Sequence, residues 1–559
     1  MTKRGWFAGW VVLLLAWPAA GGTTRTVAVG TRAAIQTAID ASSAGDTVEL
    51  PGHLDYVLDG PLRAKSGVAI EGAGMGQTVL RAAGGHDRFF DLAGTRDVTL
   101  RGFTMDGVGS GLSYGVVASN GGGHRLERVE VTRLSGTAFG PLGVYFSSGV
   151  TDSVITGSRF SEIGVDSTFG GGIRIAHGSV RNTVVGNKVK NTGRGGIFFN
   201  DDSGQAVVRG NTVTGSGLRS QGLGIELHTG VDGSVVEDNR VDSWLSVDGS
   251  DRVAVRRNVI GGVPGAGFKF AGLELVDVNR VVLADNRVDG NADVGLSLSG
   301  QGVTESVIVA RNQVGGANSF SAQLQGDDGD DGDGALRGVL LLQNTLSDAV
   351  GGDGFVGSGF GDGLRVNDNV QDLLAVGNKL TGHAGRGITL TGDNERLRFV
   401  GNTVHENQKD AFDPVQVSGL PADLQWLGND VADNGSDAQP VSQGFASGVP
   451  ELSLDAIGDV VAGQPIRLSV TAGAGFAPQT VLWDLGYGVP VLGSSVEVVF
   501  PKADEYTVTV LAYGDAGVAY DTRTITVIPE PGALGLVGVG GLLAWAVVGR
   551  GRRRSMHRA

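Results

Sequence analysis

The stretch Val184-Val185-Gly186-Asn187-Lys188-Val189 decides the fold, because the same phrase returns throughout the chain. Two apolar residues, a spacer, an asparagine, a second spacer and a further apolar residue make up the phrase. The intervals between successive asparagines run from 19 to 34 residues. A repeat of this length, made of short β-branched runs, is typical of a solenoid whose rungs bury their apolar faces only by stacking. The equivalent residues are Asn211, Asn239, Asn258, Asn286, Asn312, Asn344, Asn378, Asn402 and Asn429.

A second phrase follows many of these asparagines after a Gly-rich turn, and it indicates a further strand in each rung. Its apolar residues alternate with other residues at period two, which is typical of strands and not of helices. Asparagine tolerates the left-handed backbone of a bend, and stacked asparagine side chains can hydrogen-bond from rung to rung. The second phrase appears as Gly172-Ile173-Arg174-Ile175, Gly196-Ile197-Phe198-Phe199, Gly224-Ile225-Glu226-Leu227 and Gly267-Phe268-Lys269-Phe270.

Taken together, these phrases resemble the repeats of the right-handed parallel β-helix family that includes pectate-lyase-like and related polysaccharide-acting proteins. The resemblance covers residues 27–435 and implies one all-β solenoid of about a dozen rungs. Residues 35–40 and 45–51 also resemble the N-terminal cap of that family. A short helix from Ala33 to Ala41 would cover the unpaired strand edges of the first rung.

Composition restricts the functions open to the chain. It has 559 residues and a net charge of −15, with an isoelectric point near 5.0. Phosphate binding needs a basic surface, so we expect no nucleic-acid partner. Cysteine is absent, so neither disulfides nor cysteine–metal chemistry is available. Glycine accounts for 96 residues without a triplet period, which excludes collagen.

The N-terminus has the features of a secretory signal peptide over residues 1–22. Lys3 and Arg4 precede an apolar run from Trp10 to Trp17, and small residues follow as far as Gly22. The alternative is an N-terminal anchor, but the run is short for a membrane span. We therefore expect the mature protein to be exported.

At the other end, Pro529-Glu530-Pro531 precedes an apolar segment, residues 532–549, and a cluster of four arginines ending at Arg554. Residues 529–554 resemble the PEP-CTERM sorting signal of Gram-negative bacteria. The segment is long enough to form a transmembrane helix with the arginines on the cytoplasmic side. The resemblance implies recognition by an exosortase-type sorting protease and delivery to the cell surface or extracellular matrix. The alternative is a plain membrane anchor.

Residues 436–449 form a linker in our interpretation, and residues 450–528 form a separate domain. Five short alternating runs between residues 466 and 527 predict a small β-sandwich. The phrases Trp483-Asp484-Leu485-Gly486-Tyr487-Gly488 and Glu505-Tyr506-Thr507-Val508-Thr509-Val510 resemble PKD-like, immunoglobulin-type domains, although Tyr487 replaces an aspartate usual in that motif. Such a domain acts as a spacer or binds carbohydrate.

Candidate site residues follow from strand alternation, because every second side chain points outward from a solenoid strand. Counting outward positions along the second phrase predicts one exterior column with Tyr145, Arg174, Phe198, Glu226, Ser246 and Lys269. A parallel column two residues later holds Asn200, His228 and Asp248. Neighbours in a column lie about 4.8 Å apart, so they can act on one ligand.

This mixture suits a polysaccharide, because aromatic faces bind sugar rings and polar groups bind hydroxyls and carboxylates. The proposed catalytic residues are Arg174, Glu226, His228 and Lys269, and the proposed substrate-binding residues are Tyr145, Phe198, Asn200 and Asp248. Two functions stay open: a surface protein that binds or scaffolds extracellular polysaccharide, and a lyase, epimerase or glycosidase working through the exterior face. The alternative is that these residues form an ordinary solvent-exposed face of the sheet, without a binding or catalytic role.

Calcium is the one cofactor that the sequence suggests. Five aspartates in a Gly-rich stretch, Asp327, Asp328, Asp330, Asp331 and Asp333, offer the oxygen ligands that calcium prefers. The alternative is an acidic loop between rungs. We expect a monomer.

Overall fold

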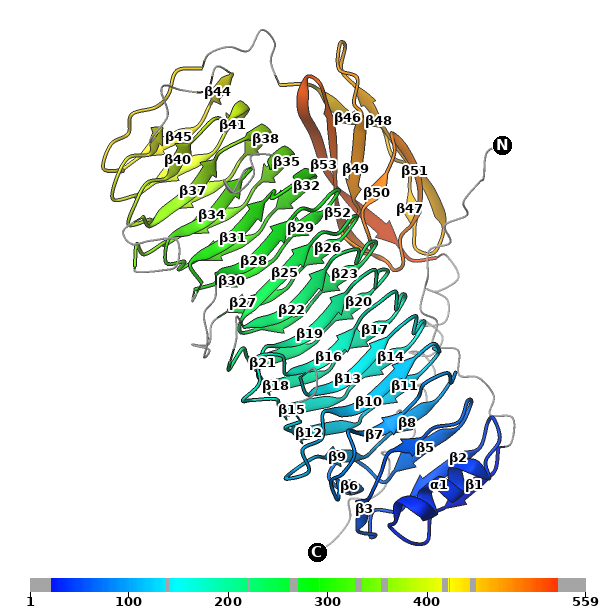
Figure 1. Cartoon of the computed structure of the whole chain (residues 1–559). Coiled ribbons are helices and arrows are strands. Elements are labelled where there is room, and N and C mark those ends of the chain that lie inside the picture. The colour runs from blue at the N-terminus through cyan, green and yellow to red at the C-terminus, as the bar shows by residue number, and fades with distance from the viewer. Residues whose placement is uncertain are drawn as a thin grey trace, which may run out of the picture.

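The computed structural model describes residues 22–136, 140–219, 222–261, 270–290, 292–326, 334–352, 360–414, 421, 423–442 and 449–530. Two units follow one another along this part of the chain (Figure 1). The first is a right-handed parallel β-solenoid, as predicted. The second is a domain of two smaller sheets.

Three parallel sheets form the solenoid over the described residues. Sheet A has 16 strands, from β1 (Thr24–Thr26) to β44 (Leu424–Leu427). Sheet B has 15 strands, from β3 (Tyr56–Leu58) to β45 (Asp430–Ala432). Sheet C has 14 strands, from β4 (Leu62–Arg63) to β43 (Phe412–Pro414). Successive strands of one sheet come from successive rungs, and each rung contributes about one strand to every sheet.

The recurring asparagines form the predicted ladder between sheets A and B. Asn211 Oδ1 accepts the Asn187 backbone N–H at 2.9 Å and the Asn187 side-chain amide at 3.1 Å. Asn239 does the same for Asn211, and the pattern continues rung by rung to Asn429. Each amide also donates to a backbone carbonyl of the preceding rung, as Asn211 does to Val184. The repeat therefore satisfies buried backbone groups at the bends, which would otherwise be costly.

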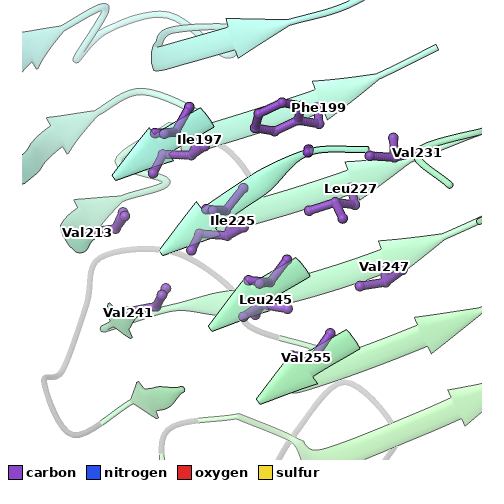
Figure 2. Close-up of a cluster of buried hydrophobic side chains, with 14 of the residues drawn as sticks. Ile197, Phe199, Val213, Ile225, Leu227, Val231, Val241, Leu245, Val247 and Val255 are labelled. Carbon is purple, nitrogen blue, oxygen red and sulfur yellow. The ribbon is translucent and has the colours of Figure 1, made fainter. Parts of the chain in front are cut away.

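The glycines that open the second phrase have a packing role. A Cβ on Gly224 would lie 2.2 Å from Val241 Cγ1, and one on Gly196 would lie 2.4 Å from Val213 Cγ1. Both valines belong to the buried core, where they pack beside Ile225 (Figure 2). Sheets B and C thus approach so closely at this corner that a side chain does not fit.

A helix caps the first rung, as the sequence predicts. α1 (Arg32–Asp40) buries Ile35 and Ile39 against the solenoid core. Thr31 is its N-cap, and the Thr31 side chain accepts the Ala34 N–H at 3.3 Å. The apolar edge of the first rung is therefore covered.

The C-terminal domain contains the strands that its sequence predicts. β48 (Pro465–Ala472) pairs with β46 (Leu452–Leu454) and β51 (Ser495–Val499) in a three-stranded sheet. β49 (Thr480–Asp484), β52 (Asp504–Gly514) and β53 (Gly517–Ile528) lie in a five-stranded sheet with β47 (Val460–Val461) and β50 (Val491–Leu492). Both sheets contribute to one apolar core around the buried Trp483. The likeness to PKD-like domains stays a prediction.

This domain packs against the outside of sheet A, so it is not a spacer that extends away from the solenoid (Figure 1). Apolar side chains of sheet A, among them Ile308, Leu340 and Leu374, share a buried cluster with Leu482 and Leu511. A completely buried ion pair joins the same surfaces. Arg256 on β26 (Ala254–Arg256) lies 2.6 Å from Asp484, and both side chains have no exposed surface.

The predicted terminal signals fall almost entirely outside the described residues. Of the predicted signal peptide only Gly22 is described, and of the sorting motif only Pro529 and Glu530. The predicted transmembrane segment, residues 532–549, also lies outside. Within the part of the chain that the structure describes, no helix is long and apolar enough to cross a membrane.

A histidine takes the place of an asparagine in a second ladder, where Asn407 and Asn434 stack beside sheet B. His383 Nδ1 accepts the Ala349 backbone N–H at 3.1 Å, and His383 Nε2 lies 3.1 Å from the Leu346 carbonyl. These contacts require the neutral ring with its proton on Nε2. Burial lowers the pKa of His383 from 6.5 to about 4.

Replacing His383 by asparagine is expected to make the protein more resistant to acid. The folded-state pKa lies below the unfolded one, so the unfolded chain binds the extra proton as pH falls from 6.5 towards 4, and stability is lost in that window. The effect at pH 5 is about 2 kcal/mol. Thermal unfolding at pH 7 and pH 5 measures it, and the exposed His53→Asn is the matched control. Equal pH dependence in the parent and His383→Asn would contradict the assignment.

Candidate functional site

Consecutive strands of sheet C bring the predicted exterior columns together. Tyr145 on β13 (Leu142–Ser147) pairs with Arg174 on β16 (Gly171–Ile175), and Arg174 pairs with Phe198 on β19 (Gly195–Asn200). Phe198 pairs with Glu226 on β22 (Leu223–His228). The column therefore has the predicted order over these four rungs.

The second column also has the predicted order. Asn200 pairs with His228, and His228 pairs with Asp248 on β25 (Trp244–Asp248). The two columns run side by side across the same face of sheet C, two residues apart along each strand. Alternation alone was sufficient to place these side chains.

An open hollow of about 190 Å³ lies over these strands. Three of the four predicted catalytic residues line it, as do two of the predicted substrate-binding residues. The full lining consists of Leu142, Phe169, Arg174, Arg194, Phe198, Asn200, Asp201, Glu226 and His228.

Glu226 lies at the floor of the hollow with 7 % of its surface exposed. Arg194 Nη2 lies 3.4 Å from Glu226 Oε1, and Asn200 Nδ2 donates to Glu226 Oε2 at 3.3 Å. The Arg194 guanidinium also lies over the Phe198 ring, 5.6 Å from its centroid. Arg194 was missed by the sequence analysis because it precedes the strand, in the turn before Gly195. The hollow thus combines cations, a buried carboxylate and an aromatic face.

His228 and Asp248 form a pair at the edge of the hollow. His228 Nε2 lies 3.4 Å from Asp248 Oδ2, and His228 Nδ1 lies 2.9 Å from Thr229 Oγ1. Burial raises the pKa of Asp248, an effect that His228 opposes and Asp277 and Glu226 reinforce. The imidazole is about half exposed, so a ligand in the hollow can reach it. A histidine oriented by a carboxylate is a common arrangement for proton transfer.

Glu274 continues the first column where Lys269 was predicted, so the register prediction for this rung is wrong. Ser246 pairs with Glu274 on β28 (Ala271–Val276), and Ser246 Oγ donates to Glu274 Oε2 at 2.7 Å. Lys269 itself lies outside the described residues. Burial, reinforced by Asp248 and Glu226, raises the pKa of Glu274 to about 7. This face therefore carries a carboxyl group whose surroundings favour its neutral form.

The calcium prediction stays untested, because Asp327, Asp328, Asp330, Asp331 and Asp333 all lie outside the described residues. Among the residues that are described, no group of three or more histidine, aspartate or glutamate side chains is arranged to hold a metal ion.

Comparison with known proteins gives one family match and several relatives. Residues 90–260 match the model of the right handed beta helix region. Mannuronan C5-epimerase AlgE4 of Azotobacter vinelandii is 36% identical over 148 residues, which cover 22% of this chain and 27% of the epimerase. Mannuronan C5-epimerase AlgE5 of the same organism is 29% identical over 249 residues, which cover 38% of this chain and 23% of that protein. The chain therefore spans about a quarter of the length of these curated relatives.

Among solved structures, similarity is found to the A-module of mannuronan C-5 epimerase AlgE6 of Azotobacter vinelandii. The identity is 18% and the TM-score 0.38, over 74% of this chain and 97% of that module. A mutant of the periplasmic alginate epimerase AlgG gives 13% identity and a TM-score of 0.39, over 66% of this chain and 77% of that one.

Proposed function

We propose that this protein acts on an acidic extracellular polysaccharide at the sheet C hollow and removes the C5 proton of a uronate residue. One observation carries the proposal. Arg174, Arg194 and the His228–Asp248 pair converge on a single hollow beside the aromatic ring of Phe198. Cations and a proton-transfer group are the components that this chemistry needs.

The arginines act on the carboxylate of the uronate. A proton on the carbon next to a carboxylate is weakly acidic, because its removal places further negative charge on that group. Arg174 and Arg194 offer cationic hydrogen-bond donors that stabilise this developing charge in a partly enclosed site. Glu226 holds Arg194 in position through the 3.4 Å contact.

His228 is the residue that we assign as base. The Thr229 hydroxyl and Asp248 hold its ring, and about half of the imidazole surface remains accessible. The C–H bond breaks as the proton passes to His228 Nδ1, which gives up its contact with the Thr229 hydroxyl while Nε2–H stays towards Asp248, and the electron pair stays on C5 and its carboxylate. Returning a proton to the opposite face gives a C5 epimer. Loss of the C4 oxygen substituent instead gives an unsaturated product and a cleaved chain.

Similarity to proteins named mannuronan C5-epimerases supports the first of these outcomes, although the shared region is about a quarter of their length. Polysaccharide binding without chemistry is the second candidate function. The polar columns that continue along sheet C through Ser297, Ser299, Gln323 and Gln325 favour it, because binding alone requires only such a surface. The two candidates differ in whether C5 exchanges its proton.

We place this activity outside the cell. Residues 1–22 support export, and Pro529-Glu530-Pro531 with the apolar and arginine-rich segments that follow supports membrane anchoring and recognition by an exosortase-type protease. An extracellular location brings the sheet C face into contact with polysaccharide.

Incubation of the full-length protein with polymannuronate in D₂O tests the proposal. NMR reports deuterium at C5, and ultraviolet absorbance reports unsaturated ends. We expect exchange in the parent and a loss of about 100-fold or more in His228→Ala, the range typical for removal of a general base. Arg174→Ala should also lose activity. Arg181→Ala is the matched control, because Arg181 is an exposed arginine paired with Asp152 at 2.7 Å and does not line the hollow.

If the parent gives neither deuterium at C5 nor ultraviolet absorbance on uronate polymers of different composition, the catalytic proposal is wrong. Affinity electrophoresis on the same polymers then decides whether the binding function holds.

A further inference from the structure

A second cation lies on the same face of sheet C, five rungs beyond Glu226. The column continues from Glu274 through Ser297 and Gln323 to Arg365 on β37 (Asp362–Asn367). At about 4.8 Å for each rung, Arg365 lies roughly 24 Å from Glu226 along the solenoid axis. It is therefore separate from the hollow but continuous with its column.

Arg365 lacks the carboxylate partner that many arginines of this solenoid have. Its guanidinium carbon lies 5.0 Å from the Phe320 ring centroid and 5.5 Å from that of Phe360. None of the described residues forms an ion pair with it, and its buried Nε has no hydrogen-bond partner. By contrast, Arg386, which precedes the next strand of sheet C, β40 (Ile388–Thr391), lies 2.6 Å from Asp413.

The acidic group on the same strand is already engaged. Asp362, which is fully buried, accepts the Arg386 backbone N–H at 2.8 Å and the Thr389 hydroxyl at 3.0 Å. Burial also lowers the pKa of Arg365, but a guanidinium stays protonated in proteins. A desolvated cation without a partner is costly, and an incoming anion would offset that cost.

Neutral hydrogen-bonding side chains surround the guanidinium. Gln323 precedes it in the column, and Gln323 Oε1 is buried without a partner. Gln325 and Asn367 occupy the parallel column on the same two rungs. One cation and several amides together match a sugar that bears both hydroxyls and a negative charge, while the fully buried Phe320 ring and Phe360 pack against the guanidinium.

We propose that Arg365 binds an anionic group of the same polysaccharide and forms a distal subsite that holds the polymer while the hollow works on a residue about 24 Å away. This inference rests on the proposed function for the identity of its ligand. The subsite selects long acidic chains over short ones, because only a chain that reaches both places engages both cations. Carboxylates of a uronan and sulfate esters of a sulfated glycan share the required chemistry.

Isothermal titration calorimetry tests the inference. It compares the affinity of the parent and of Arg365→Gln for a uronate trisaccharide and for the long polymer. The long polymer should bind about tenfold more weakly to this variant than to the parent, since a charge-assisted contact is lost. The trisaccharide should bind both proteins equally. Arg365→Lys should recover part of the loss, because it restores charge without the planar fork. The matched control is Arg287→Gln, an exposed arginine 2.8 Å from Asp289 on sheet B.

Unfolding temperatures of the variants equal to that of the parent exclude a folding defect. Equal affinity of the parent and Arg365→Gln for the long polymer would overturn the inference even if C5 exchange occurs. Conversely, suppose that the parent shows no C5 exchange while Arg365→Gln selectively loses binding of the long polymer. That result would support the subsite and contradict only the proposed chemistry. Binding of a sulfated glycan but no uronan would overturn the carboxylate assignment.

Discussion

Replacement of Asp484 by alanine is expected to lower the free energy of unfolding by about 3–5 kcal/mol, the range measured when one partner of a buried ion pair is removed. Asp484 Oδ1 accepts from Arg256 Nε at 3.1 Å and from Arg256 Nη2 at 2.6 Å. Neither side chain has exposed surface. The substitution leaves a guanidinium enclosed between the solenoid and the C-terminal domain. We expect the domain to detach, because water can then solvate Arg256.

Small-angle X-ray scattering and differential scanning calorimetry of the full-length chain measure this effect. Detachment should increase the radius of gyration, and we expect two unfolding transitions in the variant and one in the parent. Asp455→Ala is the matched control, since the Asp455 carboxylate accepts from Ser469 and Thr471 on β48, within the C-terminal domain.

The double variant Arg256→Leu with Asp484→Leu distinguishes the cost of an unpaired buried charge from the loss of the contact between the two surfaces. It should be more stable than Asp484→Ala, because no uncompensated charge remains and the surrounding cluster is apolar. If Asp484→Ala keeps the parent's dimensions and stability, the pair does not hold the domain in place.

The docking of this domain could have been predicted from runs that we interpreted only as strands. Early sheet A strands alternate, as in Thr183-Val184-Val185, where Val184 alone is buried. Later runs such as Val307-Ile308-Val309-Ala310 are apolar on both faces and buried throughout. A strand that is apolar at consecutive positions is covered on both sides. The change in pattern along the chain marks where the covering domain packs.

The wrong register at Lys269 has a different cause. The phrase Gly267-Phe268-Lys269-Phe270 has the glycine–apolar–charged–apolar pattern, but Gly272-Leu273-Glu274-Leu275 has it too, only a few residues later. Alternation cannot distinguish two phrases of one pattern, because both present a charged residue outward. The structure uses the second phrase, where a Cβ on Gly272 would lie 2.4 Å from Val288 Cγ1. Only the fit against the neighbouring sheet decides the register.

The asparagine phrase, by contrast, was sufficient to predict the solenoid, since each rung needs the same side chain at the same bend. An exterior site residue such as Arg194 follows no such repeat. Its position depends on one turn in one rung, and its partner Glu226 comes from the next rung. Repetition therefore identifies the scaffold and its exterior columns from sequence alone, whereas a residue in a turn, such as Arg194, is placed in the site only when neighbouring rungs are stacked.

Substitution of Asn258 by alanine is the sharpest test of that scaffold, with an expected loss of roughly 3–5 kcal/mol. Asn258 Oδ1 accepts from the Asn239 backbone at 3.0 Å and from the Asn239 side chain at 3.0 Å. Asn258 Nδ2 donates to the Val236 carbonyl at 2.9 Å and to Asn286 Oδ1 at 3.0 Å. Alanine leaves these groups buried and unsatisfied, and each such group costs about 1–3 kcal/mol when water cannot replace the partner.

Asn429→Ala is the matched control at the open end of the same ladder. Asn429 accepts from Asn402 and donates to Phe399, but it is only partly buried, so water can take over these contacts at about 1 kcal/mol. Native-state hydrogen exchange should show faster exchange at the Asn239 amide in Asn258→Ala and little change there in Asn429→Ala. Because the rungs of a solenoid stabilise each other mainly through nearest neighbours, the loss should be greatest around the substituted rung and decrease with distance. If the two substitutions lowered the free energy of unfolding equally, the asparagine ladder would be present in the stacked rungs without stabilising them.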